Sequence, residues 1–379
     1  MKKILYIHHD GGIGGAPKSL SFLINDLDKT NYEPVVLMVM DGPARKLFED
    51  AGAKVIVDTR LGAFHGSTVS GMSFKLFLRN ILYLLPSYFL AKLIIKRINP
   101  DIIHLNSASL FIYAKAANKV DKSIPIVSHI REPLLNSFFG DILKFMNHKY
   151  VDYYIAIEKY DLSTMNTKNK LTSVVYNSVD FEFYNPDVYS NVIKDELNLR
   201  NDDILILYLA RITKSNGALE LVRSIKESIE GTNIHLAVIG YDKKNFSEYV
   251  EEVLKESSSN IHIMELRDDV PNVIASSDIM VVPFTQPHFA RSVIEAAAMG
   301  KPSVVSNVKG LDELVVDGQT GIIYDLKSSQ DLLNSIKILV DDEPLRKNMG
   351  EKAYIRAKEL FDTKKNSNRI FRIYDSLLK

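Results

Sequence analysis

Short runs of aliphatic and β-branched residues recur along the chain, and most are followed by a turn and a segment of helical period. Buried strands that alternate with helices pair in parallel through right-handed crossovers. The expected strands of the first half are residues 4–8, 33–40, 54–58, 102–106, 124–129, 153–158 and 173–177. In the second half they are residues 204–210, 235–240, 261–264, 279–283 and 303–306. The alternation predicts an α/β fold built from doubly wound parallel sheets.

The strand series is interrupted once, and the length of the chain favours more than one core. A chain of 379 residues is too long for one ordinary domain. Residues 180–186 form a turn-rich connector, after which the series restarts, so we place a boundary near residue 190. The expected domains are two Rossmann-like units, residues 1–189 and 190–379. A final helix over residues 363–379 is a candidate to pack back on the N-terminal domain through Ile370, Ile373, Tyr374 and Leu377.

Composition excludes several classes of function. Lys plus Arg and Asp plus Glu both number 47, so the bulk charge does not favour a nucleic-acid partner. The absence of cysteine excludes disulfides, thiolate metal sites and thiol nucleophiles, and it fits a reducing cytoplasm. No carboxylates cluster at metal-binding spacing, so we expect no essential metal; we also expect no cofactor. The N-terminal apolar stretch is too short for a signal peptide, and no run of about 18 apolar residues predicts a membrane span.

One segment departs from the neutral average. Between Gly71 and Pro100 there is no acidic residue, and the basic residues are Lys75, Arg79, Lys92, Lys96 and Arg97. An apolar run, residues 81–91, lies among them. The simpler interpretation is one or two buried helices broken at Pro86. The alternative is a basic amphipathic surface that rests peripherally on the inner face of an anionic membrane.

A glycine-rich turn, residues 11–17, follows the first strand. A dinucleotide fingerprint needs Gly or Ala where Pro17 stands, so that interpretation weakens. Without side chains the backbone can approach a ligand closely, and a helix that begins near Lys18 would turn its N-terminus toward anionic groups. The alternative is a flexible turn without a ligand.

Polar side chains also stand at the ends of later strands. His129 ends one strand, while Arg211 and Lys214 follow the first strand of the second half. Carboxyl ends of parallel strands line the ligand crevice of doubly wound folds, and Arg binds phosphate through paired charge-assisted hydrogen bonds. The simpler interpretations are a structural histidine and solvated cations. Position favours a ligand site that includes His129 and Arg211.

The segment from Ser292 to Ser306 is the most informative one. We expect Glu295 to open a helix of small residues that ends at Gly300 and leads into a β-branched run. The preceding strand and its continuation, residues 278–286, place Glu295 near the carboxyl edge of a parallel sheet, where open α/β folds bind ligands.

These motifs resemble family 4 of the glycosyltransferases, and the likeness covers nearly the whole chain. Segments 309–314 and 317–321 add to it. The resemblance implies the GT-B architecture, in which two doubly wound domains face each other across a cleft. It also implies a retaining, hexosyltransferase-type enzyme in cell-surface polysaccharide synthesis. Such an enzyme moves a sugar from a UDP- or GDP-linked donor to a glycan or lipid-linked acceptor, with the nucleotide on the second domain and the acceptor on the first.

The resemblance also assigns roles to residues. His129 would orient the donor sugar or stabilise developing charge, rather than act as a general base. Arg211 would hold the diphosphate; Asn216 stands where the family usually has Lys, and Lys214 is the candidate substitute. The remaining donor-binding candidates are Gly14, Gly15, Ala16, Gly240, His288, Phe289, Ala290, Arg291, Ser292 and Glu295.

Two departures from the family pattern keep alternatives open. The family has two Glu residues eight positions apart; Glu295 matches the second, which meets the ribose, but Pro287 stands at the first. His288 is the nearest polar replacement for the missing carboxylate. Because of Pro287 and Asn216, a donor-binding protein without turnover is one alternative, and a nucleotide-sugar epimerase of similar fold is another. The segment from Asn177 to Asp180 resembles a family turn, and we interpret it as structural.

Overall fold

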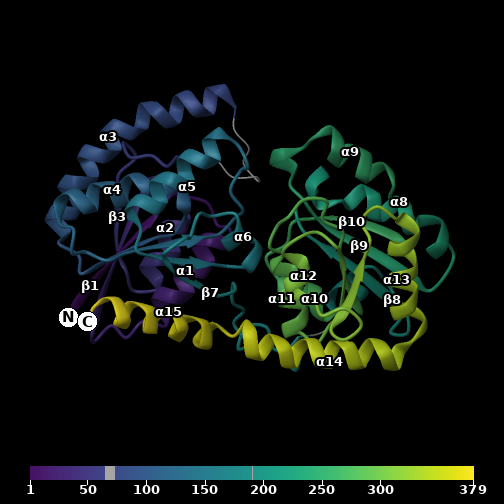
Figure 1. The fold of residues 1–379 in the computed structure, drawn as a ribbon. Helices are drawn as coiled ribbons and strands as arrows, with labels where there is room; N and C mark the ends of the chain where they lie inside the picture. Colours follow the sequence, from purple (N-terminus) through teal and green to yellow (C-terminus); the bar gives the residue numbers. More distant parts are fainter. Residues whose placement is uncertain (65–72, 190) are drawn as a thin grey trace. The chain divides into compact units, whose positions relative to one another are not determined.

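In the computed structural model, which describes residues 1–64, 73–189 and 191–379, the chain forms two compact units (Figure 1). The first unit contains Met1–Asn177 and Thr363–Lys379, and the second contains Ser178–Asp362. The division therefore precedes the expected boundary near residue 190, and residue 190 itself lies outside the described residues. The connector, residues 180–186, belongs to the second unit, and just before it the Val179 amide donates to the Phe361 carbonyl at 2.7 Å.

The first unit is built on a sheet of seven parallel strands in the order β3-β2-β1-β4-β5-β6-β7. The strands are β1 (Lys2–His8), β2 (Tyr32–Met38), β3 (Lys54–Val57), β4 (Ile102–Leu105), β5 (Ile126–Ile130), β6 (Tyr153–Ala156) and β7 (Leu171–Val174). The chain winds outward from β1 in one direction and returns through β4 in the other. The point where the order reverses, between β1 and β4, is where doubly wound sheets bind ligands.

Helices cover both faces of this sheet because side chains alternate along each strand. One face, which includes Leu5 and Ile7, packs on α3 (Phe74–Ile98), α4 (Phe111–Val120) and α5 (Phe138–Tyr150). The other face, with Ile4 and Tyr6, packs on α1 (Gly15–Asn25), α2 (Ala44–Asp50) and the C-terminal helix α15 (Thr363–Leu377). Two short helices complete the unit, η1 (Ala108–Leu110) and α6 (Lys159–Ser163).

Helix α3 differs from the simpler expectation. It runs without a break through Pro86, and much of its apolar surface is exposed rather than buried. Pro86 removes a hydrogen bond from the helix, but buried residues on both sides of it, Asn80, Ser87 and Ala91, hold the helix against the unit. Tertiary packing thus overrides the break. Residues 71 and 72 of the basic segment lie outside the described residues. No helix in the described ranges has the length and apolar character needed to cross a membrane.

The second unit repeats the design with six parallel strands in the order β10-β9-β8-β11-β12-β13. They are β8 (Ile204–Leu209), β9 (Ile234–Tyr241), β10 (Ile261–Glu265), β11 (Ile279–Val282), β12 (Ser303–Ser306) and β13 (Gly321–Tyr324). The strand order reverses between β8 and β11. Strand β13 was not among the strands expected from the sequence. The expected α/β class with two doubly wound, Rossmann-like domains is confirmed.

The helices of this unit again lie on both sides of the sheet (Figure 1). Helices α8 (Ala218–Ile229), α9 (Glu248–Lys255) and α13 (Ser329–Asp341) bury one face. Helix α11 (Arg291–Ala298) packs against β11 and against α14 (Glu343–Leu360). The short helices are α7 (Val192–Glu196), η2 (Lys214–Asn216), η3 (Lys243–Asn245), α10 (Val270–Ala275) and α12 (Leu311–Leu314).

Candidate functional site

In the second unit, the segments that follow β8 and β11 are fastened together where the strand order reverses. The Thr285 amide donates to the Ser215 carbonyl at 2.9 Å, and the Thr285 hydroxyl donates to the Lys214 carbonyl at 3.1 Å. Farther along, the Ser306 hydroxyl donates to the Phe284 carbonyl at 2.6 Å. The loop after β8 is therefore held in one position at the edge of the sheet where ligands bind in this fold class.

Two glycines allow this close packing. Gly217 caps α8 with a φ of 69°, and a Cβ there would lie 2.1 Å from the Pro283 carbonyl oxygen. Gly240, near the end of β9, has a φ of 155°, and its Cβ would lie 1.7 Å from the Ala210 carbonyl oxygen. No other residue fits either position. The predicted donor-binding residue Gly240 thus supports the loop that carries Arg211.

The loop after β8 carries exposed cations. Arg211 and Lys214 are both exposed, and neither forms an ion pair with any residue that the structure describes. The Asn216 amide donates to the Arg211 carbonyl at 2.8 Å, so Asn216 braces the loop instead of supplying the charge that the family's Lys would bring. Burial and the Arg211 charge lower the pKa of His288, which favours its neutral form. Two uncompensated cations at this edge suit an anionic ligand.

Glu295 lies in the second turn of α11. The helix begins at Arg291, so the expectation that Glu295 opens it is wrong by one turn. Arg291 donates from Nε to Glu295 Oε1 at 3.2 Å and from Nη2 to the Ser178 carbonyl at 3.1 Å. Burial raises the pKa of Tyr184, and the nearby negative charge of Glu295 is the second largest cause. The Tyr184 hydroxyl also bonds to the Glu295 carboxylate. The carboxylate is thus held by two neighbours and still has lone pairs to accept further donors.

The other candidates of this segment occupy a buried turn. Phe289, Ala290 and Ser292 are buried, while Pro287 and His288 are partly exposed. The rings of His288 and Phe284 lie 5.7 Å apart. The predicted residue Arg291 acts on Glu295 in this structure, so we treat it as a residue that positions the carboxylate.

In the first unit, Arg131 connects the ends of several strands. Its Nε donates to Asn106 Oδ1 at 2.8 Å, and its Nη1 donates to Asn177 Oδ1 at 3.2 Å. The Ser19 hydroxyl reaches the same Asn177 oxygen at 3.0 Å. Asn177, interpreted from the sequence as part of a structural turn, is therefore also a member of a polar network at the ligand edge of the sheet.

The same network fixes the tautomers of two histidines. Arg131 Nη2 lies 3.3 Å from His129 Nδ1, and a guanidinium only donates, so the ring proton of His129 is on Nε2. The Asn106 amide lies 2.9 Å from His8 Nδ1, which places the proton of His8 on Nε2 as well. Both Nε2 atoms are buried and have no hydrogen-bonding partner among the described residues. Each is a donor that a ligand could satisfy.

The glycine-rich turn borders this network. The Ala16 carbonyl accepts from the Asn106 amide at 3.3 Å, and α1 begins at Gly15 without a side-chain cap. Around Gly14 no atom lies within 4 Å of the position a Cβ would take. The predicted residues Gly14, Gly15, Ala16 and His129 are thus brought to one edge of the first sheet.

Sequence reasoning missed four contributors to these sites, namely His8, Asn106, Arg131 and Tyr184. His8, Asn106 and Arg131 lie at or just after the ends of β1, β4 and β5, so the rule that selected His129 could have found them. Tyr184 lies in the connector, and no local signal in the sequence pointed to it.

Buried histidines make the first unit sensitive to acid. Burial lowers the pKa of His104 from 6.5 to about 3, and it also lowers the pKa values of His8 and His129. Because the pKa of each histidine is lower in the folded than in the unfolded state, its contribution to the free energy of unfolding is fully present above about pH 6.5. Below that pH the contribution falls by about 1.4 kcal/mol per pH unit for each histidine. Urea unfolding midpoints should therefore drop between pH 7.5 and pH 5.5.

The control for this prediction is His148 on α5, which is partly exposed. His104→Asn should flatten the pH dependence of the unfolding free energy, whereas His148→Gln should leave it as in the wild type. Equal midpoints at the two pH values in the wild-type protein would show that these imidazoles do not resist protonation.

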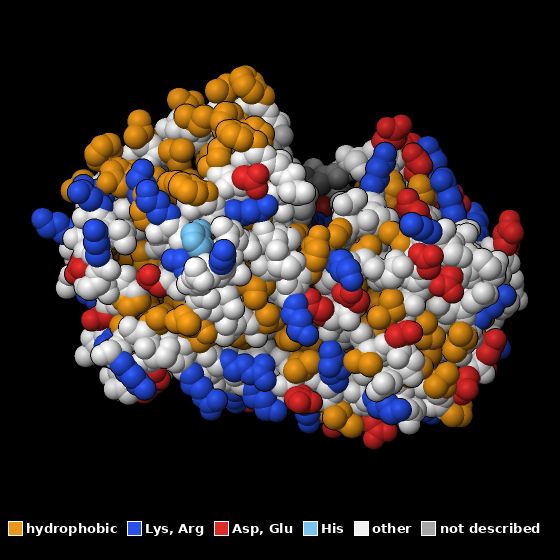
Figure 2. Space-filling model, in the orientation of Figure 1, with side chains coloured by type: hydrophobic (Ala, Val, Ile, Leu, Met, Phe, Trp, Pro, Cys, Tyr) orange, Lys and Arg blue, Asp and Glu red, His pale blue; other side chains and the backbone are white. Residues whose placement is uncertain are grey.

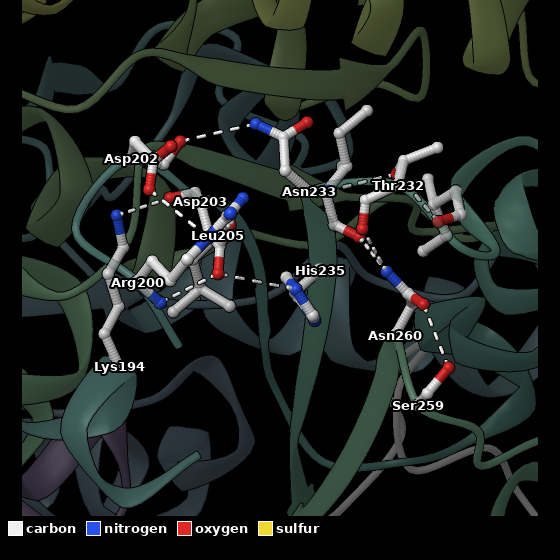
Figure 3. A network of polar contacts seen from close by, with 12 residues as sticks. Lys194, Arg200, Asp202, Asp203, Leu205, Thr232, Asn233, His235, Ser259 and Asn260 are labelled. Carbon is white, nitrogen blue, oxygen red and sulfur yellow. Dashed lines mark hydrogen bonds and ion pairs between the residues drawn. The ribbon is translucent and has the colours of Figure 1, made fainter. Parts of the chain in front are cut away.

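At the amino ends of β8, β9 and β10, a separate polar network joins the turns (Figure 3). Arg200 donates to Asp203 at 3.0 Å, and the Asn260 amide donates to the carbonyls of Thr232 and Ile234 at 3.0 and 2.8 Å. This is the sheet edge opposite the candidate site, and its contacts stabilise the strand starts. Across the described residues, no three His, Asp or Glu side chains are grouped as metal ligands.

Two family models match the chain. The model described as Glycosyltransferase Family 4 matches residues 13–183, and the model described as Glycosyl transferases group 1 matches residues 190–356. Together the two matches cover most of the sequence, with one match falling largely on each unit.

Individual proteins agree with these matches. The chain is 27% identical over 223 residues to the capsular polysaccharide biosynthesis glycosyltransferase CapM of Staphylococcus aureus. The aligned region covers 57% of this chain and 58% of CapM. It is 26% identical over 377 residues, 94% of each chain, to the N,N'-diacetylbacillosaminyl-diphospho-undecaprenol alpha-1,3-N-acetylgalactosaminyltransferase of Campylobacter jejuni. The crystal structure of Anabaena Alr3699/HepE in complex with UDP and glucose shares the fold, with a TM-score of 0.81, 20% identity and coverage of 99% of this chain and 100% of that chain.

Proposed function

We propose that this chain, which belongs to family 4 of the glycosyltransferases, transfers a sugar from a UDP-linked donor to a lipid-linked glycan acceptor. The observation that carries the proposal is the braced loop after β8, which presents Arg211 and Lys214 without ion-pair partners at the edge where the strand order reverses. A diphosphate is the anion that such a donor would place there. The uridine nucleotide is supported by the UDP bound to Alr3699/HepE.

The proposed reaction makes one bond and breaks one bond. An acceptor oxygen bonds to C1 of the sugar, the bond from C1 to the diphosphate oxygen breaks, and its electron pair leaves with the nucleoside diphosphate. The hydroxyl proton goes to the leaving diphosphate or to solvent. Negative charge grows on the leaving group, so Arg211 and Lys214 would stabilise the transition state more than the ground state. Retention of the anomeric configuration is part of the proposal, and the family resemblance supports it.

Glu295 would bind the ribose of the donor. Arg291 and Tyr184 hold its carboxylate, and its remaining lone pairs can accept two neighbouring hydroxyl groups. The first unit would hold the acceptor or the sugar through the Nε2 donors of His8 and His129 beside the glycine-rich turn. His129 acts as a donor in this arrangement, since its Nδ1 faces Arg131.

The acceptor class is supported by the relatives. The Campylobacter jejuni enzyme is named for a diphospho-undecaprenol substrate, and CapM is named for capsular polysaccharide synthesis. A lipid-linked acceptor lies in a membrane, so we propose that this enzyme acts at the cytoplasmic surface of one, in polysaccharide assembly.

The test begins with binding and then follows the products. Calorimetric titration with UDP, GDP and ADP should show that UDP binds most tightly. Single-turnover reactions with UDP-sugars and undecaprenyl-diphosphate-linked acceptors should yield a glycosylated lipid. NMR should show that the transferred sugar keeps the anomeric configuration that it had in the donor. An unchanged donor would indicate a protein that binds without turnover, and an isomerised sugar would indicate an epimerase.

Pro287 gives a separate prediction about how affinity is divided. Since proline replaces a carboxylate that would meet the donor sugar, UDP should bind this protein nearly as well as the UDP-sugar does. Pro287→Glu should shift the preference toward the UDP-sugar by roughly 1–3 kcal/mol, the range for hydrogen bonds to charged groups. Calorimetry with both ligands measures this difference, and unfolding curves control for the freed backbone angle. A wild-type protein that binds the UDP-sugar a hundredfold better than UDP would contradict the prediction and indicate that other groups rebuilt the sugar pocket.

A further inference from the structure

Helix α3 is apolar on two faces, and the first unit needs only one of them. Its inner face buries Ala91, Ile95 and Ile98 in the core that α3 shares with α4 and one face of the sheet. The outer face carries large apolar side chains three or four positions apart, each 46–76% exposed: Phe74, Leu78, Leu82, Leu85, Phe89 and Leu93. Residues at this spacing share one side of a helix. We name these six residues the α3 stripe.

The apolar surface extends beyond α3. The rings of Phe77 on α3 and Phe139 on α5 lie 4.7 Å apart, so the two helices meet. Next to Phe139, Phe138 is 72% exposed. Figure 2 shows hydrophobic side chains gathered over α3, with Lys and Arg side chains beside them. Contiguous exposed apolar patches of this kind mark interaction surfaces.

The charges around the α3 stripe select the partner. Lys75, Arg79, Lys96 and Arg97 are exposed on the same helix, and Lys92 lies over the Tyr88 ring. From residue 73 to residue 100 the chain has no acidic side chain. Apolar side chains flanked by cations of one sign complement a surface that is apolar inside and anionic outside, which describes a bilayer containing acidic lipids.

We propose that the α3 stripe and its flanking cations dock the enzyme on an anionic lipid bilayer, with α3 lying in the plane of the headgroups. The inference deepens the proposed function and rests on it in one respect, because a lipid-linked acceptor is presented at such a surface. The helix lies on the bilayer without crossing it: its inner face is already buried in the protein, and it carries five cations. Docking places the first unit at the membrane, where the acceptor is anchored.

The test is co-sedimentation of the whole 379-residue chain with vesicles of phosphatidylcholine alone, or of phosphatidylcholine with about 30% phosphatidylglycerol. The wild-type protein should bind the anionic vesicles and release them as salt screens the charges. Two variants should each bind the anionic vesicles at least about tenfold more weakly than the wild type. The stripe variant, Leu82→Gln/Leu85→Gln/Phe89→Gln, loses apolar contact with the bilayer. The charge variant, Lys75→Gln/Arg79→Gln/Lys96→Gln, loses three cations, each of which accounts for about fivefold in affinity. All six side chains are exposed, so the fold should survive.

Matched controls lie on the second unit. Ile338→Gln/Ile355→Gln replaces exposed apolar side chains, and Lys337→Gln/Lys352→Gln removes exposed charges; both should bind vesicles like the wild type. Failure of the wild-type protein to bind at low salt, or wild-type binding by the stripe variant, overturns the proposal. A stripe variant that turns a dimer into a monomer, without vesicle binding by either form, assigns the surface to a second copy of the chain and also overturns it.

Activity separates this inference from the proposed function. With a short-chain acceptor that stays in solution, the stripe variant should transfer sugar as fast as the wild type. A wild-type protein that transfers sugar but does not bind vesicles refutes the docking proposal and leaves the proposed reaction standing. If vesicle binding is lost in the stripe variant and kept in the controls, but no acceptor is glycosylated, docking is supported and the proposed reaction is refuted.

Discussion

Arg211→Ala is expected to lower turnover with a UDP-sugar by on the order of 100-fold or more, the usual loss when a group that stabilises developing charge is removed. The loop that carries Arg211 is braced by Asn216 and Gly240, so the side chain can be removed while the backbone stays in place. The charge matters most when the diphosphate departs. The loss should therefore appear in kcat, measured under saturating donor, more than in the KM for the donor.

Two further variants sharpen this expectation. Arg211→Lys keeps the charge but loses the planar fork that matches a phosphate, so its turnover should fall between those of the wild type and the alanine variant. Arg372→Ala on α15 removes an exposed arginine of the first unit and should leave turnover unchanged. Wild-type turnover in Arg211→Ala would leave Arg211 as a solvated side chain and would remove the main support for a diphosphate at this loop.

Glu295→Gln is expected to weaken UDP binding by roughly 1.5–3 kcal/mol, or about 10- to 150-fold, because hydroxyl groups bond more strongly to a carboxylate than to an amide. Calorimetry with UDP and with UMP measures the effect. If Glu295 meets the ribose, both nucleotides should lose the same free energy, whereas Arg211→Ala should weaken UDP far more than UMP. This difference separates the ribose end of the site from the diphosphate end.

Glu295→Gln also breaks the ion pair with Arg291, so the free energy of unfolding must be measured in parallel. Tyr184→Phe is the matched variant: it removes the hydroxyl that bonds to Glu295 but keeps the carboxylate, and its effect on UDP should be smaller. Unchanged UDP affinity in a folded Glu295→Gln protein would take Glu295 out of the nucleotide site.

The strands were predictable because strands buried on both faces appear as continuous apolar runs, and their alternation with helices implies parallel sheets. Helix α3 was not predictable in the same way. Pro86 and the apolar run around it favoured buried, broken helices, but in the structure α3 packs against α4 as one unbroken helix, and six of its large apolar residues are exposed. Local sequence shows which residues are apolar, and only the tertiary fold decides which of them are covered.

The sites divide along the same line. Arg211 and Glu295 could be proposed from the sequence, since each follows a predicted strand and matches a motif of the family. Asn106 and Arg131 could have been found by the strand-end rule, but the hydrogen bonds of the Arg131 network could not, because Asn106, Asn177 and His129 come from segments that become neighbours only through the strand order of the sheet. Asn216 shows the converse: its position suggested a phosphate ligand, and its hydrogen bond gives it a structural role.

The C-terminal helix α15 has a consequence for how the protein is made. It places Tyr374 against His104 in the core of the first unit, although the whole second unit is translated before it. The second unit, Ser178–Asp362, is one continuous segment and can complete its core while the ribosome is still working, because domains generally fold as units during synthesis. The first unit is assembled from two distant segments, so its core closes last. We therefore expect a gene fragment for the second unit alone to yield a folded domain, whereas a fragment that stops at Asn177 lacks the α15 residues that cover part of one face of the first sheet.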